Sequence, residues 1–160
     1  MKKIITICSA ILLLFSMMSC QGIYENGKEL AQEVNKTITQ ISVDSLQMMM
    51  ERGDDFLLLD VRQPNEFAKG NIAYSTLIPR GEVEFKILDN SFWDEQGIYA
   101  PEKDGRIIVY CQKGSRGALA TYALMKMGFI NVSNLTGGFD AFDPEHEDSG
   151  EVEEEGGCGG

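Results

Sequence analysis

Residues 106–127 read RIIVYCQKGSRGALATYALMKM, and this stretch decides the fold. The apolar run from Ile107 to Tyr110 is typical of a buried strand, and the Ala-, Leu- and Met-rich segment after Gly117 is typical of a helix. Cys111 lies between them, at the end of the predicted strand, and a short polar loop follows it. The stretch therefore predicts a strand, a tight loop and a helix that begins beside a cysteine.

A thiol in this position faces the unpaired N–H groups of the helix's first turn and the positive end of the helix dipole. Lys113 and Arg116 add two cationic side chains. Such surroundings favour the thiolate, which is the nucleophilic form of cysteine. We therefore predict that Cys111 is a catalytic nucleophile, although an isolated cysteine in a core is more often an inert thiol.

The loop after Cys111 is suited to holding an anion. Successive backbone N–H groups can surround a negative charge there, as they do in phosphate-binding loops. Glycine permits the tight turns that this requires, and a serine hydroxyl can donate a further hydrogen bond. The residues predicted to bind the substrate are Gln112, Lys113, Gly114, Ser115, Arg116 and Gly117.

Strands and helices alternate along the rest of the chain. The apolar patterns predict strands over 38–41, 56–59, 72–78, 107–110 and 132–135. Helices are expected from Asp44 to Gly53, from Pro64 to Gly70 and over 82–88, whereas 89–105 is expected to be rich in loops. This alternation predicts a single α/β domain with a mainly parallel sheet flanked by helices. Ligands of such sheets bind beyond the carboxyl ends of the strands, where Cys111 and Asp60 are placed.

Composition excludes several classes of function. The formal net charge of -11 and the pI of about 4.5 argue against nucleic-acid binding, which needs a basic surface. The single histidine, His146, makes a Ser–His–Asp triad or a His-rich metal site improbable. Since no paired CxxC spacing is present, a structural zinc site is not expected either. We expect neither a metal nor an organic cofactor.

The N-terminus has the pattern of a secretion signal. Lys2 and Lys3 precede an apolar run over 4–18 that is too short for a full membrane span. The sequence Met-Met-Ser-Cys at 17–20 resembles the bacterial lipoprotein cleavage motif. We expect a signal peptide over 1–19, a lipid on Cys20 and a polar, partly helical tether over 20–37. Either this or an ordinary signal or anchor places the domain outside the cytoplasm, on the periplasmic side or the cell surface.

The C-terminus is acidic and rich in glycine. Residues 143–160 offer almost nothing to bury and are predicted to be a disordered tail. The tail carries Cys158, which with Cys111 is one of the two cysteines left after the signal and the lipid site are set aside. Cys158 could act as a resolving thiol or sulfur acceptor for Cys111 on a flexible tether, it could have no internal role, or it could pair with another protein.

Three separated segments resemble one family. LLLDVRQPNEFAKGNI at 57–72, LIPRGE at 77–82 and the run from Ile107 to Phe139 together are similar to a single rhodanese domain, which would occupy residues 38–142. The resemblance implies a compact α/β sulfurtransferase without a cofactor. It also implies that Cys111 takes a sulfane sulfur from a small donor such as thiosulfate or polysulfide, and passes it as a persulfide to a thiol acceptor.

The resemblance extends to supporting residues. Asp60 and Arg62 match the family's Asp-Val-Arg motif, and Glu66 matches the acid that follows it. We expect these three to hold the loops together around the site rather than to take part in the chemistry. Asn71 stands where the family commonly has histidine, and Phe139 where it commonly has tryptophan or tyrosine after two glycines.

Two other functions fit parts of this pattern. Phosphatases of the rhodanese fold also place a cysteine and an arginine around such a loop, but with five residues between them, whereas Cys111 and Arg116 enclose four. The shorter loop indicates a pocket for a sulfur atom rather than a phosphate. A non-catalytic binding or sensing module is the second alternative. Retention of the cysteine argues against it.

Overall fold

Apolar runs form a five-stranded sheet in the computed structural model, which describes residues 22–146. The strands are β1 (Thr39–Ile41), β2 (Leu57–Asp60), β3 (Thr76–Leu77), β4 (Ile107–Tyr110) and β5 (Val132–Leu135). All pairings are parallel, in the order β1-β5-β4-β2-β3. The prediction of a parallel α/β domain is confirmed, and β1 and β3 lie at the two edges of the sheet.

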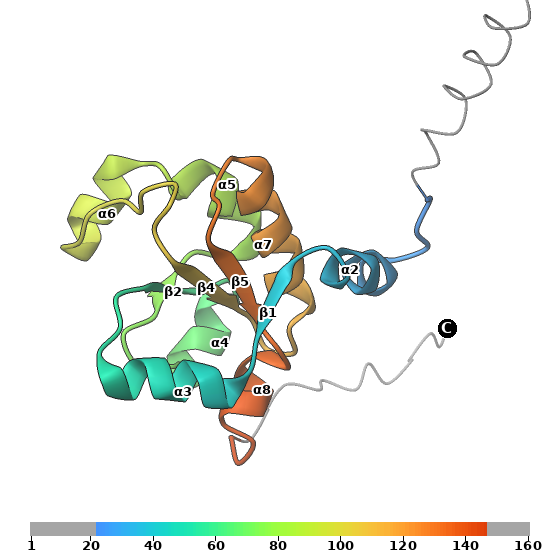
Figure 1. The fold of residues 1–160 in the computed structure, drawn as a ribbon, viewed down its shortest axis with the longest axis horizontal. Coiled ribbons are helices and arrows are strands. Elements are labelled where there is room, and N and C mark those ends of the chain that lie inside the picture. The colour runs from blue at the N-terminus through green and yellow to red at the C-terminus, as the bar shows by residue number, and fades with distance from the viewer. Residues whose placement is uncertain (1–21, 147–160) are drawn as a thin grey trace, which may run out of the picture.

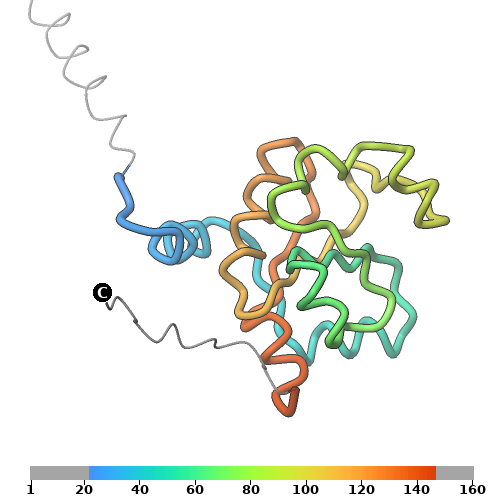
Figure 2. The backbone as a smooth tube through the Cα atoms, turned by 180° about the vertical axis from the view of Figure 1, so that it is seen from behind, coloured from blue at the N-terminus to red at the C-terminus, as the bar shows by residue number. Residues whose placement is uncertain are grey.

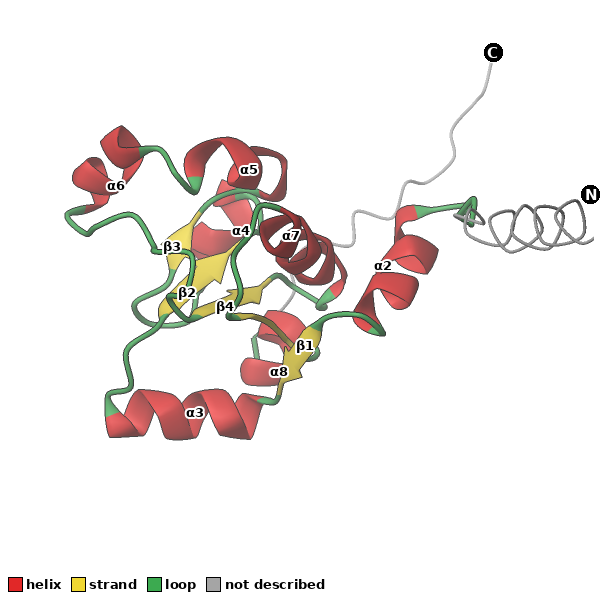
Figure 3. Cartoon of the chain, turned by 45° about the horizontal axis from the view of Figure 1, so that its top comes forward, coloured by secondary structure: helices red, strands yellow, loops and turns green. Residues whose placement is uncertain are grey.

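Helices cover both faces of this sheet, as Figures 1 and 3 show. The helical segments are α2 (Gly27–Asn35), α3 (Val43–Arg52), α4 (Pro64–Lys69), the 3-10 turn η1 (Arg80–Glu82), α5 (Val83–Lys86), α6 (Asn90–Gln96), α7 (Ser115–Lys126) and α8 (Gly138–Phe142). None of the helices within 22–146 has both the length and the apolar character needed to traverse a bilayer.

The two sides of the sheet bury separate cores because alternate strand residues point to opposite faces. Ile107 and Val109 pack with residues of α5 and α7, and with Trp93 of α6. Ile108 and Tyr110 pack with residues of α3 and α8. Strand β4 is fully buried along its length, which positions the residue that follows it, Cys111, at the centre of the molecule.

The segment from 89 to 105 differs from the prediction of a loop-rich region. It contains α6, which begins after Asp89 and ends at Gly97 in a left-handed conformation. The side chain of Asp89 accepts a hydrogen bond from the Ser91 N–H at 3.0 Å. Trp93 is completely buried and its indole N–H donates to the Ile87 carbonyl at 2.9 Å. The capping residue and one large aromatic therefore outweigh the polar composition of this helix.

Other boundaries shift by a few residues. Helix α3 is capped by Ser42, whose hydroxyl accepts the Ser45 N–H at 3.2 Å, so the helix begins before the predicted start at Asp44. A carboxylate such as Asp44 is still favourable in the first turn of a helix. The third strand was predicted over 72–78. It is limited to Thr76–Leu77 because, of the residues in that range, these two form the strand pairing with β2.

Both ends of the described chain pack on the domain. Within the segment expected to be a tether, α2 lies against α7 and buries Ala31 and Val34. At the other end, residues 143–146 form a turn, and the His146 ring contacts the Phe139 ring with centroids 5.0 Å apart. Figure 2 shows the two ends leaving from different parts of the domain. The expected signal peptide, Cys20, Cys158 and most of the acidic tail lie outside the described residues.

Candidate active site

Cys111 directly follows β4, and the three residues after it, Gln112 to Gly114, lead into α7. Gly114 takes a left-handed conformation with φ of 92° as the capping residue of α7. Its backbone N–H points back and donates to the Cys111 sulfur at 3.2 Å. The turn predicted from the sequence thus places the sulfur at the N-terminal end of a twelve-residue helix, where the first-turn N–H groups lack intrahelical partners.

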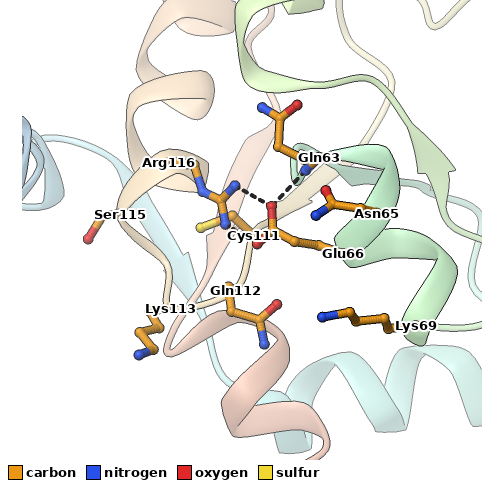
Figure 4. Close-up of a pocket in the computed structure, with 9 residues that line it drawn as sticks. All are labelled: Gln63, Asn65, Glu66, Lys69, Cys111, Gln112, Lys113, Ser115 and Arg116. Carbon is orange, nitrogen blue, oxygen red and sulfur yellow. Dashed lines mark hydrogen bonds and ion pairs between the residues drawn. The ribbon is translucent and has the colours of Figure 1, made fainter. Parts of the chain in front are cut away.

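A cleft of about 460 Å³ opens beside this sulfur. Helix α4 and its preceding residue form one wall, and the loop with the start of α7 forms the other, as Figure 4 shows. Its lining residues are Gln63, Asn65, Glu66, Lys69, Cys111, Gln112, Lys113, Ser115 and Arg116. Only 1% of Cys111 is exposed. A reactant must therefore enter the cleft to reach the sulfur.

An ion pair joins the two walls of the cleft. Both terminal nitrogens of Arg116 donate to the carboxylate of Glu66, at 2.6 and 2.7 Å. Hydrogen bonds from Arg116 lower the pKa of Glu66, and the same contact, with a smaller contribution from Cys111, raises the pKa of Arg116. Arg116 was predicted to orient an anionic donor. In this structure its guanidinium is bound to a carboxylate that lies 50 residues earlier in the chain.

Glu66 has a second role at the start of α4. Its carboxylate accepts the Gln63 N–H at 2.8 Å, which closes a capping box with Pro64 in the first turn. A capping box satisfies N–H groups that the helix itself cannot pair. The carboxylate is therefore fixed from both sides, by its own helix and by Arg116.

Asp60 and Arg62 form a completely buried ion pair behind the loop. The Asp60 carboxylate accepts from Nε and Nη2 of Arg62 at 2.8 to 3.1 Å. The guanidinium also donates to the Gly70 carbonyl at 2.7 Å and to the side-chain oxygen of Gln112 at 3.0 Å. Neither Asp60 nor Arg62 lines the cleft. Their contacts tie β2, the end of α4 and the loop into one unit.

Gln112 is turned toward this buried network. Its amide oxygen accepts from Arg62, and its amide nitrogen donates to the carboxylate of Asp140 in α8. Lys113 is exposed, and Ser115 is partly exposed at the first position of α7. Of the six loop residues predicted to bind substrate, Gln112, Lys113, Ser115 and Arg116 line the cleft, while Gly114 and Gly117 are buried beneath it.

Helix α8 contacts the backbone of the loop that begins at Cys111. The sequence had not predicted this contact. The N–H groups of Phe139 and Asp140 donate to the carbonyls of Cys111 and Gln112 at 2.8 and 3.0 Å. A Cβ atom on Gly138 would lie 2.2 Å from the Cys111 carbonyl oxygen. The pair of glycines after a predicted strand was the available signal for such a close approach.

Asn134 is a second supporting residue that was not predicted. It is almost completely buried in β5, and its amide nitrogen donates to the Gly114 carbonyl at 3.2 Å. Its amide oxygen would lie 2.3 Å from a Cβ atom on Gly117. The only signal in the sequence was a polar amide within a predicted strand that begins with valine and ends with leucine. Within the described part of the chain, no cluster of three or more His, Cys, Asp or Glu side chains could hold a metal ion.

Comparison with known proteins defines the class. The family model described as "Rhodanese-like domain" matches residues 42–145. This protein therefore belongs to the rhodanese-like domain family. Its parallel five-stranded sheet flanked by helices agrees with the fold of solved structures in this family.

Two curated relatives carry sulfurtransferase names. A protein of Schizosaccharomyces pombe named "Putative thiosulfate sulfurtransferase, mitochondrial" is 37% identical over 83 residues, which cover 51% of this chain and 58% of that protein. A protein of Allochromatium vinosum named "Sulfurtransferase" is 29% identical over 105 residues, or 66% of this chain and 88% of the relative. This chain thus matches little more than half of the first relative's length. The names support a sulfurtransferase-type function at the level of the family.

Solved structures of similar fold bear two different descriptions. The human single-domain sulfurtransferase TSTD1 has a TM-score of 0.59 at 26% identity, covering 64% of this chain and 93% of that one. A protein of unknown function from Rhodopseudomonas palustris, described as a possible tyrosine phosphatase, has a TM-score of 0.61 at 26% identity. That match covers 79% of this chain and 96% of the other. The site, and not the fold, must therefore decide between the two chemistries.

Proposed function

We propose that this protein is a sulfurtransferase in which Cys111 carries the sulfur as a persulfide. The observation that carries the proposal is the position of the Cys111 sulfur, which accepts the Gly114 N–H and faces a cleft with cationic side chains on both walls. A thiolate and a terminal persulfide sulfur are both anions, so one such position serves both states of the cysteine.

In the first step, the Cys111 thiolate attacks the sulfane sulfur of the donor. With thiosulfate, the new bond joins the cysteine sulfur to that sulfur, the S–S bond of thiosulfate breaks, and sulfite leaves with the bonding electrons. The enzyme is left with an anionic persulfide. The N–H groups at the start of α7 stabilise this charge, since donors that point at a developing anion lower its free energy.

In the second step, an acceptor thiolate attacks the outer sulfur of the persulfide. The bond between the two enzyme-bound sulfurs breaks, and Cys111 leaves as a thiolate ready for the next donor. The acceptor is released as a persulfide. Because each step exchanges one S–S bond for another, no metal or redox cofactor is needed for this mechanism.

The geometry of Arg116 favours sulfur transfer over phosphate transfer. A phosphatase needs its loop arginine to hold two oxygens of a phosphate, whereas both terminal nitrogens of Arg116 are bound to Glu66. The loop is also one residue shorter than the phosphatase pattern. A binding module without chemistry has no need for a cysteine sulfur aligned with a helix N-terminus.

The proposal is tested by turnover with thiosulfate and a dithiol acceptor, which releases hydrogen sulfide from each persulfide formed. The wild-type chain is expected to release sulfide at a rate that depends on both reactants, and the Cys111→Ser variant is expected to release none above the uncatalysed rate. Phosphate release from a phosphotyrosine substrate, without any sulfide release, would replace this proposal by the phosphatase function.

We also propose that the domain acts outside the cytoplasm, held to a membrane by a lipid on Cys20. The support for this is the signal-like pattern of residues 1–20. In a bacterial host, the wild-type protein is expected in the membrane fraction and the Cys20→Ser variant in the soluble extracytoplasmic fraction. Equal distribution of the two would contradict a lipid anchor.

Cys158 is proposed as a resolving thiol that receives the sulfur from Cys111. The support is that Cys111 and Cys158 are the two cysteines left if the predicted signal peptide is removed and Cys20 carries a lipid, and that Cys158 lies in the glycine-rich sequence at 156–160. The Cys158→Ser variant should then turn over more slowly with the dithiol than the wild type. An unchanged rate would assign the tail cysteine no part in the reaction.

A further inference from the structure

The ion pair between Glu66 and Arg116 crosses the cleft beside the reactive sulfur. Figure 4 shows the Arg116 guanidinium between the carboxylate and Cys111. About 36% of the Arg116 side chain and 26% of the Glu66 side chain are exposed, so water and ions reach both. Any anion that enters the cleft therefore meets Arg116 only in competition with a carboxylate that is already in place.

Charge is unevenly distributed among the residues that line the cleft. Lys69, Lys113 and Arg116 are cationic, and Glu66 is the one carboxylate among the described lining residues. The pKa of Glu66 is lowered by Arg116, so the carboxylate is ionised at neutral pH. Glu66 therefore reduces the positive potential of the cleft and repels each negative charge that a donor brings.

We propose that Glu66 is a specificity-determining residue that makes the cleft favour sulfur donors with one negative charge over donors with two. This inference rests on the proposed sulfur transfer and concerns the class of donor. Repulsion scales with donor charge, so a dianion such as thiosulfate is disfavoured more than a monoanion. Organic thiosulfonates are donors with a single negative charge. Their sulfane sulfur is bonded to a sulfonyl group that carries an organic substituent in place of the second charged oxygen.

The two donors deliver the sulfur in the same way. Attack of the Cys111 thiolate on methanethiosulfonate forms the same persulfide, breaks the same type of S–S bond and releases methanesulfinate in place of sulfite. A variant that changes the reactivity of Cys111 therefore affects both donors. The ratio of their second-order rate constants isolates the effect of charge, because intrinsic differences between the leaving groups are common to all variants.

The matched variants at this position are Glu66→Gln and Glu66→Asp. Glutamine removes the charge but keeps a side-chain oxygen for the Gln63 N–H, which α4 requires. Aspartate keeps the charge. Glu84→Gln is the control elsewhere: it neutralises the partner of Arg80 in another partly exposed ion pair, which does not line the cleft.

Persulfide formation on Cys111 is measured for the whole chain by intact mass in single-turnover experiments with thiosulfate and with methanethiosulfonate. In Glu66→Gln, the ratio of the rate constant for thiosulfate to that for methanethiosulfonate should rise about fivefold relative to wild type. The reason is that the variant removes one unit charge at short range in a solvated cleft. Glu66→Asp and Glu84→Gln should leave the ratio near the wild-type value. The rise should also shrink as salt is added.

An unchanged or lower ratio in Glu66→Gln, with persulfide still formed, would overturn the specificity role and leave the sulfur transfer intact. Absence of persulfide from both donors in the wild type would instead overturn the proposed function. If Glu66→Gln does not fold, Asn65→Lys adds a cation to the same wall of the cleft. That variant should raise the ratio in the same direction, and an unchanged ratio there would also overturn the inference.

Discussion

Substitution of Gly138 tests whether close contact with α8 stabilises the loop that follows Cys111. Substitution by alanine places a methyl group 2.2 Å from the Cys111 carbonyl oxygen and 2.7 Å from the Gln112 carbonyl oxygen. Both are backbone atoms of the reactive loop, so neither can rotate away. The backbone at Gly138 also has φ of 62°, a left-handed conformation that alanine adopts only with strain.

The expected loss of stability combines three effects. Left-handed strain costs roughly 1 to 2 kcal/mol, overpacking about 1 to 3 kcal/mol, and each of the two N–H bonds from Phe139 and Asp140 to the loop about 1 kcal/mol if it is lost. Gly138→Ala should therefore lower the free energy of unfolding by about 2 to 5 kcal/mol if both hydrogen bonds remain and by about 4 to 7 kcal/mol if both are lost, a large share of the stability of a typical domain.

Gly53→Ala is the matched control. Gly53 has φ of 68° at the end of α3, and a Cβ atom there would have nothing within 4 Å. This variant should lose only the cost of left-handed strain, roughly 1 to 2 kcal/mol. Urea unfolding followed by the fluorescence of Trp93, the single and fully buried tryptophan, measures both variants. If Gly138→Ala and Gly53→Ala lost the same free energy of unfolding, α8 would not be in close contact with the carbonyls of Cys111 and Gln112.

Three further results follow from the charged residues. Asp60→Asn should destabilise the domain by about 3 to 5 kcal/mol, because it leaves the buried Arg62 without its carboxylate. Glu84→Gln removes the carboxylate of a partly exposed pair and should cost less than about 1 kcal/mol. Urea unfolding measures both variants, and a similar loss of unfolding free energy for the two would contradict the structure. Glu66 has a lowered pKa in the folded state, so its stabilising contribution is complete above the unfolded value of about 4.5 and is lost as the pH falls through the lower folded value. Unfolding midpoints measured across the acid range should therefore fall less steeply in Glu66→Gln than in wild type, and parallel curves would show that Glu66 is not paired in solution. In single-turnover experiments, the ratio of the rate constant with thiosulfate to that with methanethiosulfonate should rise about fivefold in Glu66→Gln, because the variant removes a negative charge from the cleft.

Local sequence was sufficient to predict the strand, turn and helix around Cys111 and the class of fold. The run before Cys111 and the glycines after it are short-range signals, and the structure has the predicted strand, turn and helix there. Contacts between distant segments were beyond such reasoning. The partner of Arg116 lies 50 residues away in Glu66, and no periodicity in either segment relates the two.

Missed elements have physical reasons of their own. Helix α6 is polar, and it is fixed by its Asp89 cap and by burial of Trp93 rather than by an apolar stripe. Asn134 donates one hydrogen bond to the Gly114 carbonyl, which lies 20 residues earlier in the chain, and no local pattern relates the two residues. The role of Gly138 depends on how closely α8 approaches the loop, a property of the assembled fold.

Peptide mass mapping tests whether Cys111 carries the transferred sulfur. The full chain is treated with thiosulfate, trapped with an alkylating agent and digested, and the same is done after a chase with acceptor thiol. We expect one additional sulfur atom on the peptide that contains Cys111, its loss during the chase, and its absence in Cys111→Ser. Persulfide found elsewhere in the wild type, with Cys111 unmodified at every time, would contradict the claim.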